Sequence, residues 1–160
     1  MAKIPPIDLL ALMGRSSAIQ YPLNNLTQIL SHSRLSLDVY MQWNPLFNEV
    51  SSIVGKRSAY LYGFAISEIT ESFYYAVFFR NVIIDNGEDP DNLLLTETEQ
   101  DLLSFGAEIA ERNGHIEAVT FDALKRRFTN KELVILVAFA GQMIAANVFN
   151  NVFEIETDVF

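Results

Sequence analysis

Two long apolar stretches dominate the pattern of hydrophobic and polar positions in this 160-residue chain. The first runs from Ala59 to Ile84 and carries Glu68, Glu71 and Ser72 in its middle, and the second runs from Glu132 to Phe149. Neither shows the alternation of apolar and polar residues that is typical of a half-buried strand. We therefore expect two long helices that pair in the core.

Start and stop signals divide the rest of the chain into shorter helices. Thr96-x-x-Glu99 and Thr129-x-x-Glu132 have the form of capping boxes, in which each side chain binds a free backbone N–H of the first turn. Further helix starts are predicted at Asn24 or Asn25, Ser36 and Asn44-Pro45, and helix ends at Gly55, Asn86-Gly87 and Asn113-Gly114. The sequence predicts an all-α, single-domain helical bundle of about six or seven helices.

A chain of this length buries one substantial core, so we expect residues 1–160 to form a single domain. Residues 1–22 contain three prolines and are interpreted as an N-terminal arm, and residues 154–160 as an acidic tail. The two long stretches have similar length and apolarity. A weak internal repeat and two unrelated core helices both explain this similarity.

Composition narrows the classes of partner. The formal charge is −9 and the isoelectric point is near 4.6, which disfavours nucleic acids and anionic membrane surfaces because both attract Lys and Arg. The chain has no cysteine, which excludes disulfides, thiol catalysis and cysteine-ligated metals.

Both apolar stretches were considered as membrane spans. Glu68, Glu71 and Arg80 each cost on the order of 2–3 kcal/mol at a bilayer centre. The second stretch includes Gln142 and Asn147 and is at the short limit for a span. The N-terminus lacks the form of a secretory signal, so we predict a cytoplasmic protein that contacts no membrane.

Three segments together resemble a known family: EITESFYYAVFFRNVIIDNGEDPDNL, LLTETEQDLLSFGAEIAER and FDALKRRFTNKELVILVAFAGQMIAANVFNN. Their order resembles the carboxymuconolactone decarboxylase-like superfamily, in particular its alkylhydroperoxidase D-like branch. The resemblance covers roughly residues 46–156. It implies an alkylhydroperoxidase D-like helical bundle and a homo-oligomer, most often a trimer or hexamer.

Active members of that branch carry a Glu, eleven residues, Cys-x-x-Cys and, after three further residues, a His. This spacing falls on Tyr60, Ser72, Tyr75 and Phe79, so none of the four groups is retained. The two histidines, His32 and His115, lie in other segments. Cysteine-based peroxidase chemistry is therefore excluded.

The spacing of residues 59–84 also predicts a candidate pocket. If residues 59–84 formed one helix, a single face would carry Tyr60, Phe64, Glu68, Glu71, Ser72, Tyr75 and Phe79. Tyr60, Ser72, Tyr75 and Phe79 would then line a small pocket in which Glu68 or Glu71 acts as acid or base. Alternatively, Arg57, Arg80 or a neighbouring subunit neutralises the two carboxylates, or both reach solvent. A helix break at Thr70 or Ser72 would remove the shared face.

Three further patterns concern possible contacts with another subunit, a ligand or a nucleic acid. Gly141-x-x-x-Ala145 gives the second stretch a small-residue surface suited to packing inside the protein or against another subunit. Asn147, Asn150 and Asn151 can bind a ligand or cap neighbouring helix ends. Lys125 to Arg127 read as a solvated helix face rather than a nucleic-acid site.

The leading hypothesis is a cysteine-free member of this antioxidant-related family that binds a small apolar or carboxylated molecule. The first alternative is a non-redox decarboxylase or lactone-acting enzyme that uses Glu68 or Glu71. The second is a non-catalytic oligomeric interaction protein. Whether the protein is an enzyme stays open. We expect no cofactor, and we expect no metal because Glu68-x-x-Glu71 lacks the histidines of a bundle di-iron site.

Overall fold

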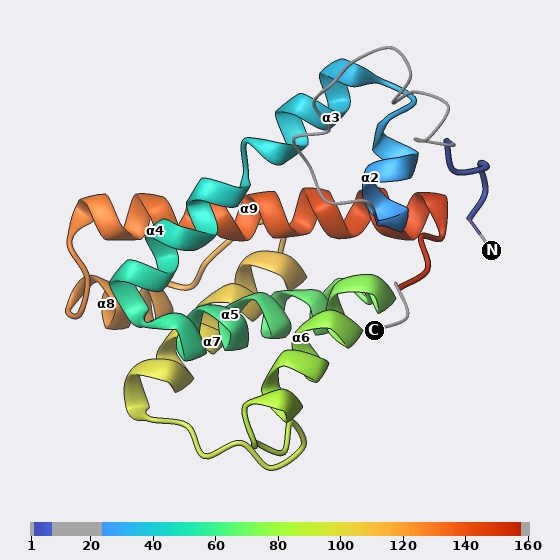
Figure 1. Cartoon of the computed structure of the whole chain (residues 1–160). Helices are drawn as coiled ribbons and strands as arrows, with labels where there is room; N and C mark the ends of the chain where they lie inside the picture. The colour runs from blue at the N-terminus through green and yellow to red at the C-terminus, as the bar shows by residue number, and fades with distance from the viewer. Residues whose placement is uncertain (1, 8–23, 158–160) are drawn as a thin grey trace.

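The computed structural model describes residues 2–7 and 24–157, and these residues fold as an all-α bundle (Figure 1). Their helices are α2 (Asn25–Leu30), α3 (Arg34–Met41), α4 (Asn44–Val54), α5 (Lys56–Ile69), α6 (Phe73–Asp85), α7 (Glu97–Glu111), α8 (Ala118–Lys125) and α9 (Asn130–Phe153). Seven of these have eight residues or more, and α2 has six. The all-α prediction is confirmed. Residues 1 and 8–22 of the predicted arm and 158–160 of the predicted tail lie outside the described residues.

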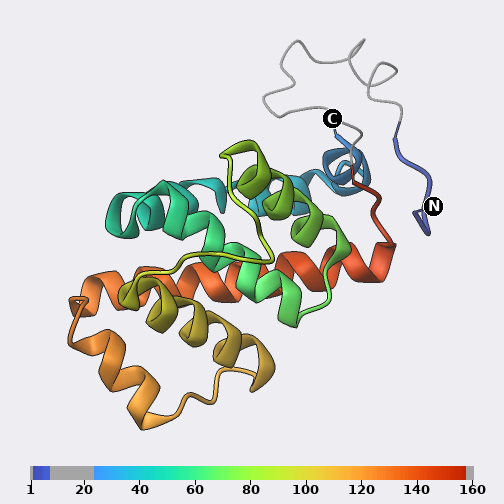
Figure 2. The same cartoon turned by 90° about the horizontal axis from the view of Figure 1, so that it is seen from below.

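Helix α9 crosses the whole molecule; in Figure 1, α5, α6 and α7 lie below it and α4 crosses in front of it, and Figure 2 shows the same helices from below. Helix α5 is the centre of the bundle, where it packs against α4, α6, α7 and α9. Two glycines permit this close packing. Gly63 on α5 lies against the ring of Phe79 on α6, and Gly106 on α7 lies against the ring of Tyr62 on α5. A methyl group at either position would clash with these rings.

The described residues contain two apolar clusters that meet along α9. The larger one joins α4 to α9 around Tyr62, Phe105 and Phe139, which are almost fully buried. The smaller one joins α2 and α3 to the C-terminal half of α9. Tyr75 packs against both clusters and so lies at the junction between them.

Both predicted capping boxes are present. Thr96 and Glu99 cap α7, and Thr129 and Glu132 cap α9 through reciprocal side-chain bonds to backbone N–H groups. Asn24 also caps α2, with its Oδ1 2.8 Å from the Thr27 N–H nitrogen. These three caps could be predicted from the sequence because each capping bond joins residues only three positions apart.

Two predicted helix starts are displaced. Ser33, rather than Ser36, is the cap of α3, because its hydroxyl accepts the Ser36 N–H. Trp43 occupies the cap position of α4, so that Asn44 and Pro45 stand in the first turn. Pro45 still lies where its missing N–H breaks no helical bond.

The first long stretch is two helices rather than one. Helix α5 ends at Ile69 and α6 begins at Phe73. Glu71 has a left-handed backbone with φ of 52°. The Ser72 N–H bonds Ser67 O at 3.0 Å and the Glu71 N–H bonds Glu68 O at 3.2 Å. This pair of bonds is a Schellman motif, with glutamate where glycine is usual. It turns α6 away from the axis of α5.

Candidate functional site

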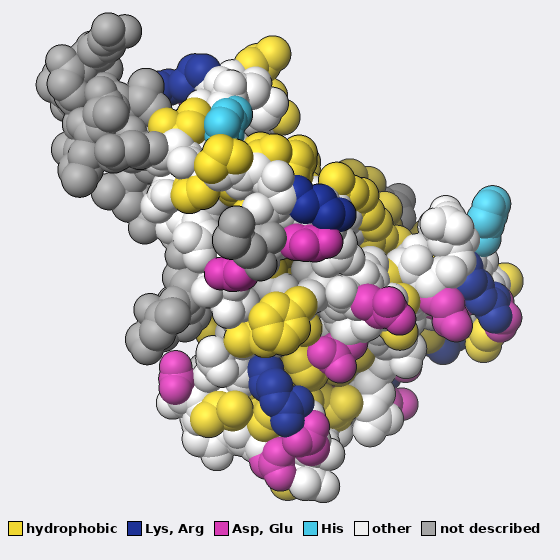
Figure 3. All heavy atoms as spheres, turned by 90° about the vertical axis from the view of Figure 1, so that its right-hand side faces the viewer, with side chains coloured by type: hydrophobic (Ala, Val, Ile, Leu, Met, Phe, Trp, Pro, Cys, Tyr) yellow, Lys and Arg dark blue, Asp and Glu magenta, His cyan; other side chains and the backbone are white. Residues whose placement is uncertain are grey.

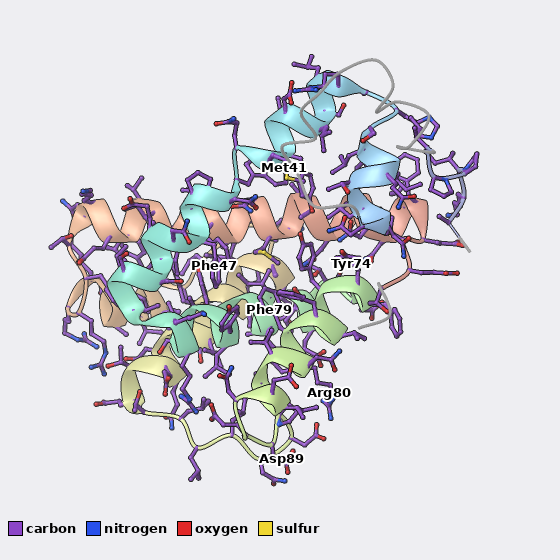
Figure 4. The ribbon with its side chains drawn as sticks, viewed as in Figure 1. Met41, Phe47, Tyr74, Phe79, Arg80 and Asp89 are labelled. Carbon is purple, nitrogen blue, oxygen red and sulfur yellow. The ribbon has the colours of Figure 1, made fainter. Side chains whose placement is uncertain are left out.

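An aromatic cavity of about 380 Å³ lies between α3, α4, α5, α6 and α9. Met41 of α3, Phe47 of α4, and Tyr74 and Phe79 of α6 converge on this region (Figure 4). The full lining consists of Asn24, Leu26, Tyr40, Met41, Asn44, Phe47, Asn48, Tyr60, Tyr74, Tyr75, Phe78, Phe79, Phe139, Gln142 and Met143. None of these described lining residues is charged. We call this space the aromatic cavity.

The polar groups of the aromatic cavity are neutral. The hydroxyls of Tyr40 and Tyr75 lie 2.9 Å apart and share a hydrogen bond. Burial raises the pKa of Tyr40 far above its usual value, and the neighbouring Tyr75 adds to this. Burial also raises the pKa of Tyr75, although the bond with Tyr40 lowers it in part. Both phenols stay protonated at neutral pH and supply no base.

One polar atom of the lining is unpaired. Gln142 Oε1 is buried and has no hydrogen-bond partner. A buried carbonyl oxygen without a donor costs free energy, on the order of 1–3 kcal/mol. A ligand that carries an O–H or N–H group would remove this cost.

The structure brings together three of the four predicted pocket residues. Tyr60, Tyr75 and Phe79 all line the aromatic cavity, and the rings of Tyr75 and Phe79 stack with centroids 5.9 Å apart. Ser72 is fully buried but does not line the cavity, and its Oγ has no partner. Ser72 is the N-cap residue of α6, so it stands at the start of the helix that carries Tyr75 and Phe79, and the break separates it from Tyr60 on α5.

Glu68 and Glu71 do not lie in the aromatic cavity. Both are exposed, Glu68 in the last turn of α5 and Glu71 in the turn that follows, so the arrangement on one continuous face is wrong. The described cations proposed to neutralise them form their ion pairs with other carboxylates: Arg57 with Glu88 and Glu99, and Arg80 with Asp91. Arg80 also interacts electrostatically with Glu68, more weakly than with Asp91. The alternative in which both carboxylates reach solvent agrees with this placement.

Asparagines of α9 hold the α5–α6 turn in place. Asn147 Nδ2 donates to Thr70 Oγ1 at 2.7 Å and to Ser67 Oγ at 3.3 Å. Asn151 Nδ2 donates to Thr70 O at 3.0 Å and so caps the end of α5. Asn150 differs from both: it is 2% exposed, and neither atom of its amide has a partner.

A second hollow, of about 440 Å³, lies beside this turn. Its lining residues are Glu71, Phe73, Tyr74, Asn150, Asn151, Glu154, Ile155 and Glu156. The hollow therefore combines exposed carboxylates with two aromatic rings and two amides. We call it the acidic hollow.

The remaining candidate features have ordinary roles. Within the described part of the chain, no group of three or more His, Asp or Glu side chains is placed to hold a metal ion. Arg127 pairs with Asp101 and Glu97, whereas Lys125 and Arg126 are exposed. Helix α9 is long and apolar enough to cross a bilayer, but the core helix of a soluble protein meets the same criterion.

Sequence reasoning missed most of the aromatic cavity. Tyr40, Met41 and Phe47 come from α3 and α4, and Phe139, Gln142 and Met143 come from α9. The one available signal was the spacing of the α9 residues, since positions 139, 142 and 143 share one helix face. No local pattern indicates that α3 and α4 close the same space.

Fold and cavity define an all-α protein with a neutral aromatic pocket. Comparison with family models, with curated proteins and with solved structures finds no match for this chain. The resemblance to the alkylhydroperoxidase D-like branch therefore stays a prediction.

Proposed function

We propose that this protein binds a small, neutral, largely apolar molecule in the aromatic cavity. The observation that carries the proposal is a space of about 380 Å³ lined by eight Phe and Tyr side chains and by no charged residue among those described. Small-molecule sites fall in this volume range and share this mixture of apolar walls and few polar groups.

The polar groups indicate what the ligand carries. A charged ligand would lose its hydration without meeting a counter-ion in the described lining, which costs several kcal/mol. A neutral ligand with one O–H or N–H group can instead donate to Gln142 Oε1. The ring faces of Phe47, Tyr60 and Phe79 favour a planar, aromatic body.

Binding is favoured over catalysis. Glu68 and Glu71, the carboxylates proposed for a decarboxylase or lactone-acting enzyme, lie outside the aromatic cavity. Burial raises the pKa of Tyr40 and Tyr75 inside it, so both hold their protons at neutral pH. Membership of the alkylhydroperoxidase D-like branch and a cytoplasmic location stay part of the proposal, and the absence of cysteine keeps thiol chemistry excluded.

Self-association is a second part of the proposal. One face of α9 is apolar and exposed over six positions: Val134, Ala138, Gly141, Ala145, Val148 and Val152. These positions lie symmetrically nine, five and two residues on either side of Met143. An antiparallel pair of α9 helices related by a two-fold axis would bring each apolar position opposite another.

Charge at the two ends of α9 agrees with the antiparallel arrangement. Lys131 is exposed near the N-terminal end, and Glu154 and Glu156 follow the C-terminal end. Position 131 lies twelve residues before Met143, so a second copy would place its residues 154–156 near Lys131. Opposite charges then meet at both ends of the interface. A trimer or hexamer would require another geometry.

Thermal denaturation with a matched pair of ligands tests the binding proposal. We expect naphthol, which is neutral and has one hydroxyl, to raise the melting temperature. Naphthoate has the same ring system and a negative charge, and we expect no effect from it. A ligand at a hundred times its dissociation constant adds about 2.7 kcal/mol to the free energy of unfolding. Equal responses to both compounds, or no response to either, would contradict the proposal.

A further inference from the structure

The acidic hollow shares Tyr74 with the aromatic cavity but has different chemistry. Its rim carries Glu71 and Glu154, and both residues are exposed. On the face drawn in Figure 3, acidic side chains stand around hydrophobic ones. None of the described residues that line the hollow is basic. The hollow therefore attracts cations.

Asn150 lies at the floor of the hollow and points to a ligand there. Its side chain is almost fully buried, and its Nδ2 and Oδ1 both lack a hydrogen-bond partner. Most buried amides in native proteins are paired, so an amide that lacks both a donor and an acceptor is unusual. A group that both donates and accepts, such as a hydroxyl, would satisfy both atoms.

The backbone holds the two rim carboxylates in unusual positions. Glu71 and Glu154 each end a helix with a φ of 52°, in the left-handed region where glycine is the common residue. Lys3 Nζ lies 3.2 Å from Glu154 Oε1, so an ammonium group already binds one of these carboxylates. No ion pair joins Glu71 to any basic residue in the described part of the chain. Glu71 is thus the carboxylate available to a ligand.

The kind of cation follows from the neighbours of Glu71. The described carboxylates do not form a metal-binding group, so a bare metal ion lacks ligands here. Phe73 is 69% exposed at the rim, and an aromatic face attracts an organic cation and covers its hydrocarbon part. A carboxylate, a ring and a buried amide together fit an organic ammonium ion.

We propose that the acidic hollow is a binding site for a small amino alcohol. Its ammonium group binds the Glu71 carboxylate, its carbon chain lies against Phe73, and its hydroxyl donates to Asn150 Oδ1 and accepts from Asn150 Nδ2. Only Tyr74, among the described residues, lines both this site and the aromatic cavity, and the site does not depend on the function proposed for the cavity.

Calorimetric titration with aminobutanol, which has its amino and hydroxyl groups at opposite ends, tests the role of Glu71. We expect Glu71→Gln to weaken binding about tenfold, because a charged hydrogen bond is lost. Glu68→Gln is the matched control. It removes the same charge three residues away, outside the hollow, and is expected to change affinity less than about twofold. Equal weakening in both variants would show non-specific attraction to an acidic protein and would overturn the proposal.

A second titration tests the role of Asn150. Butylamine lacks the hydroxyl, and we expect it to bind the unaltered protein several-fold more weakly than aminobutanol. In Asn150→Leu this difference is expected to disappear, so that both amines bind alike. An advantage of aminobutanol that persists in folded Asn150→Leu, or its absence from the unaltered protein, would place the hydroxyl elsewhere and overturn the assignment.

Discussion

Arg57, in the first turn of α5, donates to the carboxylate of Glu99, which also closes the capping box of α7. Glu99 is 5% exposed and accepts further bonds from Ser58 Oγ and from the Thr96 N–H, each at 2.9 Å. The Arg57 guanidinium also binds Glu88, in the loop after α6. One buried carboxylate therefore joins the starts of two helices that pack against each other.

This contact makes stability depend on pH. Burial raises the pKa of Glu99, but bonds from Thr96, Arg57 and Ser58 outweigh it and lower the pKa from 4.5 to about 2. The folded pKa lies below the unfolded one, so this stabilisation is present above pH 4.5 and is lost as the pH falls towards 2. We expect Glu99→Gln to lose roughly 2–3 kcal/mol of unfolding free energy at pH 7. We also expect it to flatten the pH dependence in urea titrations.

Glu132→Gln is the control for that experiment. Glu132 closes the same kind of capping box on α9, but it lacks an arginine partner in the described structure and is less buried. We expect a smaller loss of stability than in Glu99→Gln. Equal losses would show that the capping box alone, and not the bond from Arg57, accounts for the effect.

Two glycine replacements should change stability in opposite directions. A Cβ at Gly106 would clash with the Tyr62 ring, which is buried and fixed by a bond from its hydroxyl to Leu136 O at 3.2 Å. We expect Gly106→Ala to cost about 1–3 kcal/mol. A Cβ at Gly141 meets nothing within 4 Å. Gly141→Ala should therefore gain roughly 0.5–1 kcal/mol from helix propensity. Thermal denaturation at low protein concentration measures both, and a loss in Gly141→Ala would contradict the packing described for α9.

A third glycine tests the aromatic cavity. A Cβ at Gly63 would lie 2.5 Å from Phe79 Cζ, at the tip of a ring that lines the cavity. We expect Gly63→Ala to push this ring into the cavity and to abolish the rise in melting temperature caused by naphthol. Gly141 is exposed and does not line the cavity, so Gly141→Ala should keep the full response. A full response in Gly63→Ala would mean that naphthol binds elsewhere.

Ala145→Glu tests self-association through α9. Ala145 is exposed next to the centre of the apolar face, and a carboxylate there would be buried against a second copy without a partner. We expect sedimentation experiments to show a dimer for the unaltered protein and a monomer for Ala145→Glu. Gln100→Glu adds the same charge on α7 and should leave the dimer unchanged. A monomeric unaltered protein would refute the interface.

The left-handed residue between α5 and α6 predicts a gain of stability. Glu71 stands where glycine is favoured, and the left-handed backbone costs other residues about 1 kcal/mol. We expect Glu71→Gly to raise the free energy of unfolding by about this amount. Glu68→Gly, within the last turns of α5, should lower it by a similar amount. Chemical denaturation of both variants measures the difference, and a loss in Glu71→Gly would show that the glutamate side chain stabilises the turn.

The features that could be predicted from the sequence are those set by contacts between residues close together in the chain. Both capping boxes and the all-α class follow from interactions within one turn of helix, so their signals are readable in the chain. The break at Glu71 is harder to predict, because a Schellman motif without glycine has no distinctive residue at its left-handed position. Thr70 and Ser72 gave only a general indication of a possible cap.

The sites depend on contacts between distant residues and were predicted only in part. The prediction was correct for Tyr60, Tyr75 and Phe79, which line the cavity because α5 and α6 pack against each other despite the break. Tyr40 joins them through a hydroxyl contact with Tyr75 across 35 positions, which no local pattern encodes. The unpaired amide of Asn150 depends on how α9 meets the turn, so the sequence alone could not distinguish it from Asn147 and Asn151.

The chain has a single tryptophan, and its position gives the protein an intrinsic optical reporter. Trp43 lies between α3 and α4, with its ring centroid 4.7 Å from that of Tyr40 in the cavity wall. Its fluorescence comes from one known place in the molecule. Emission from this ring should therefore follow events in the cavity without an added dye, and a cysteine introduced for labelling would be the only thiol present.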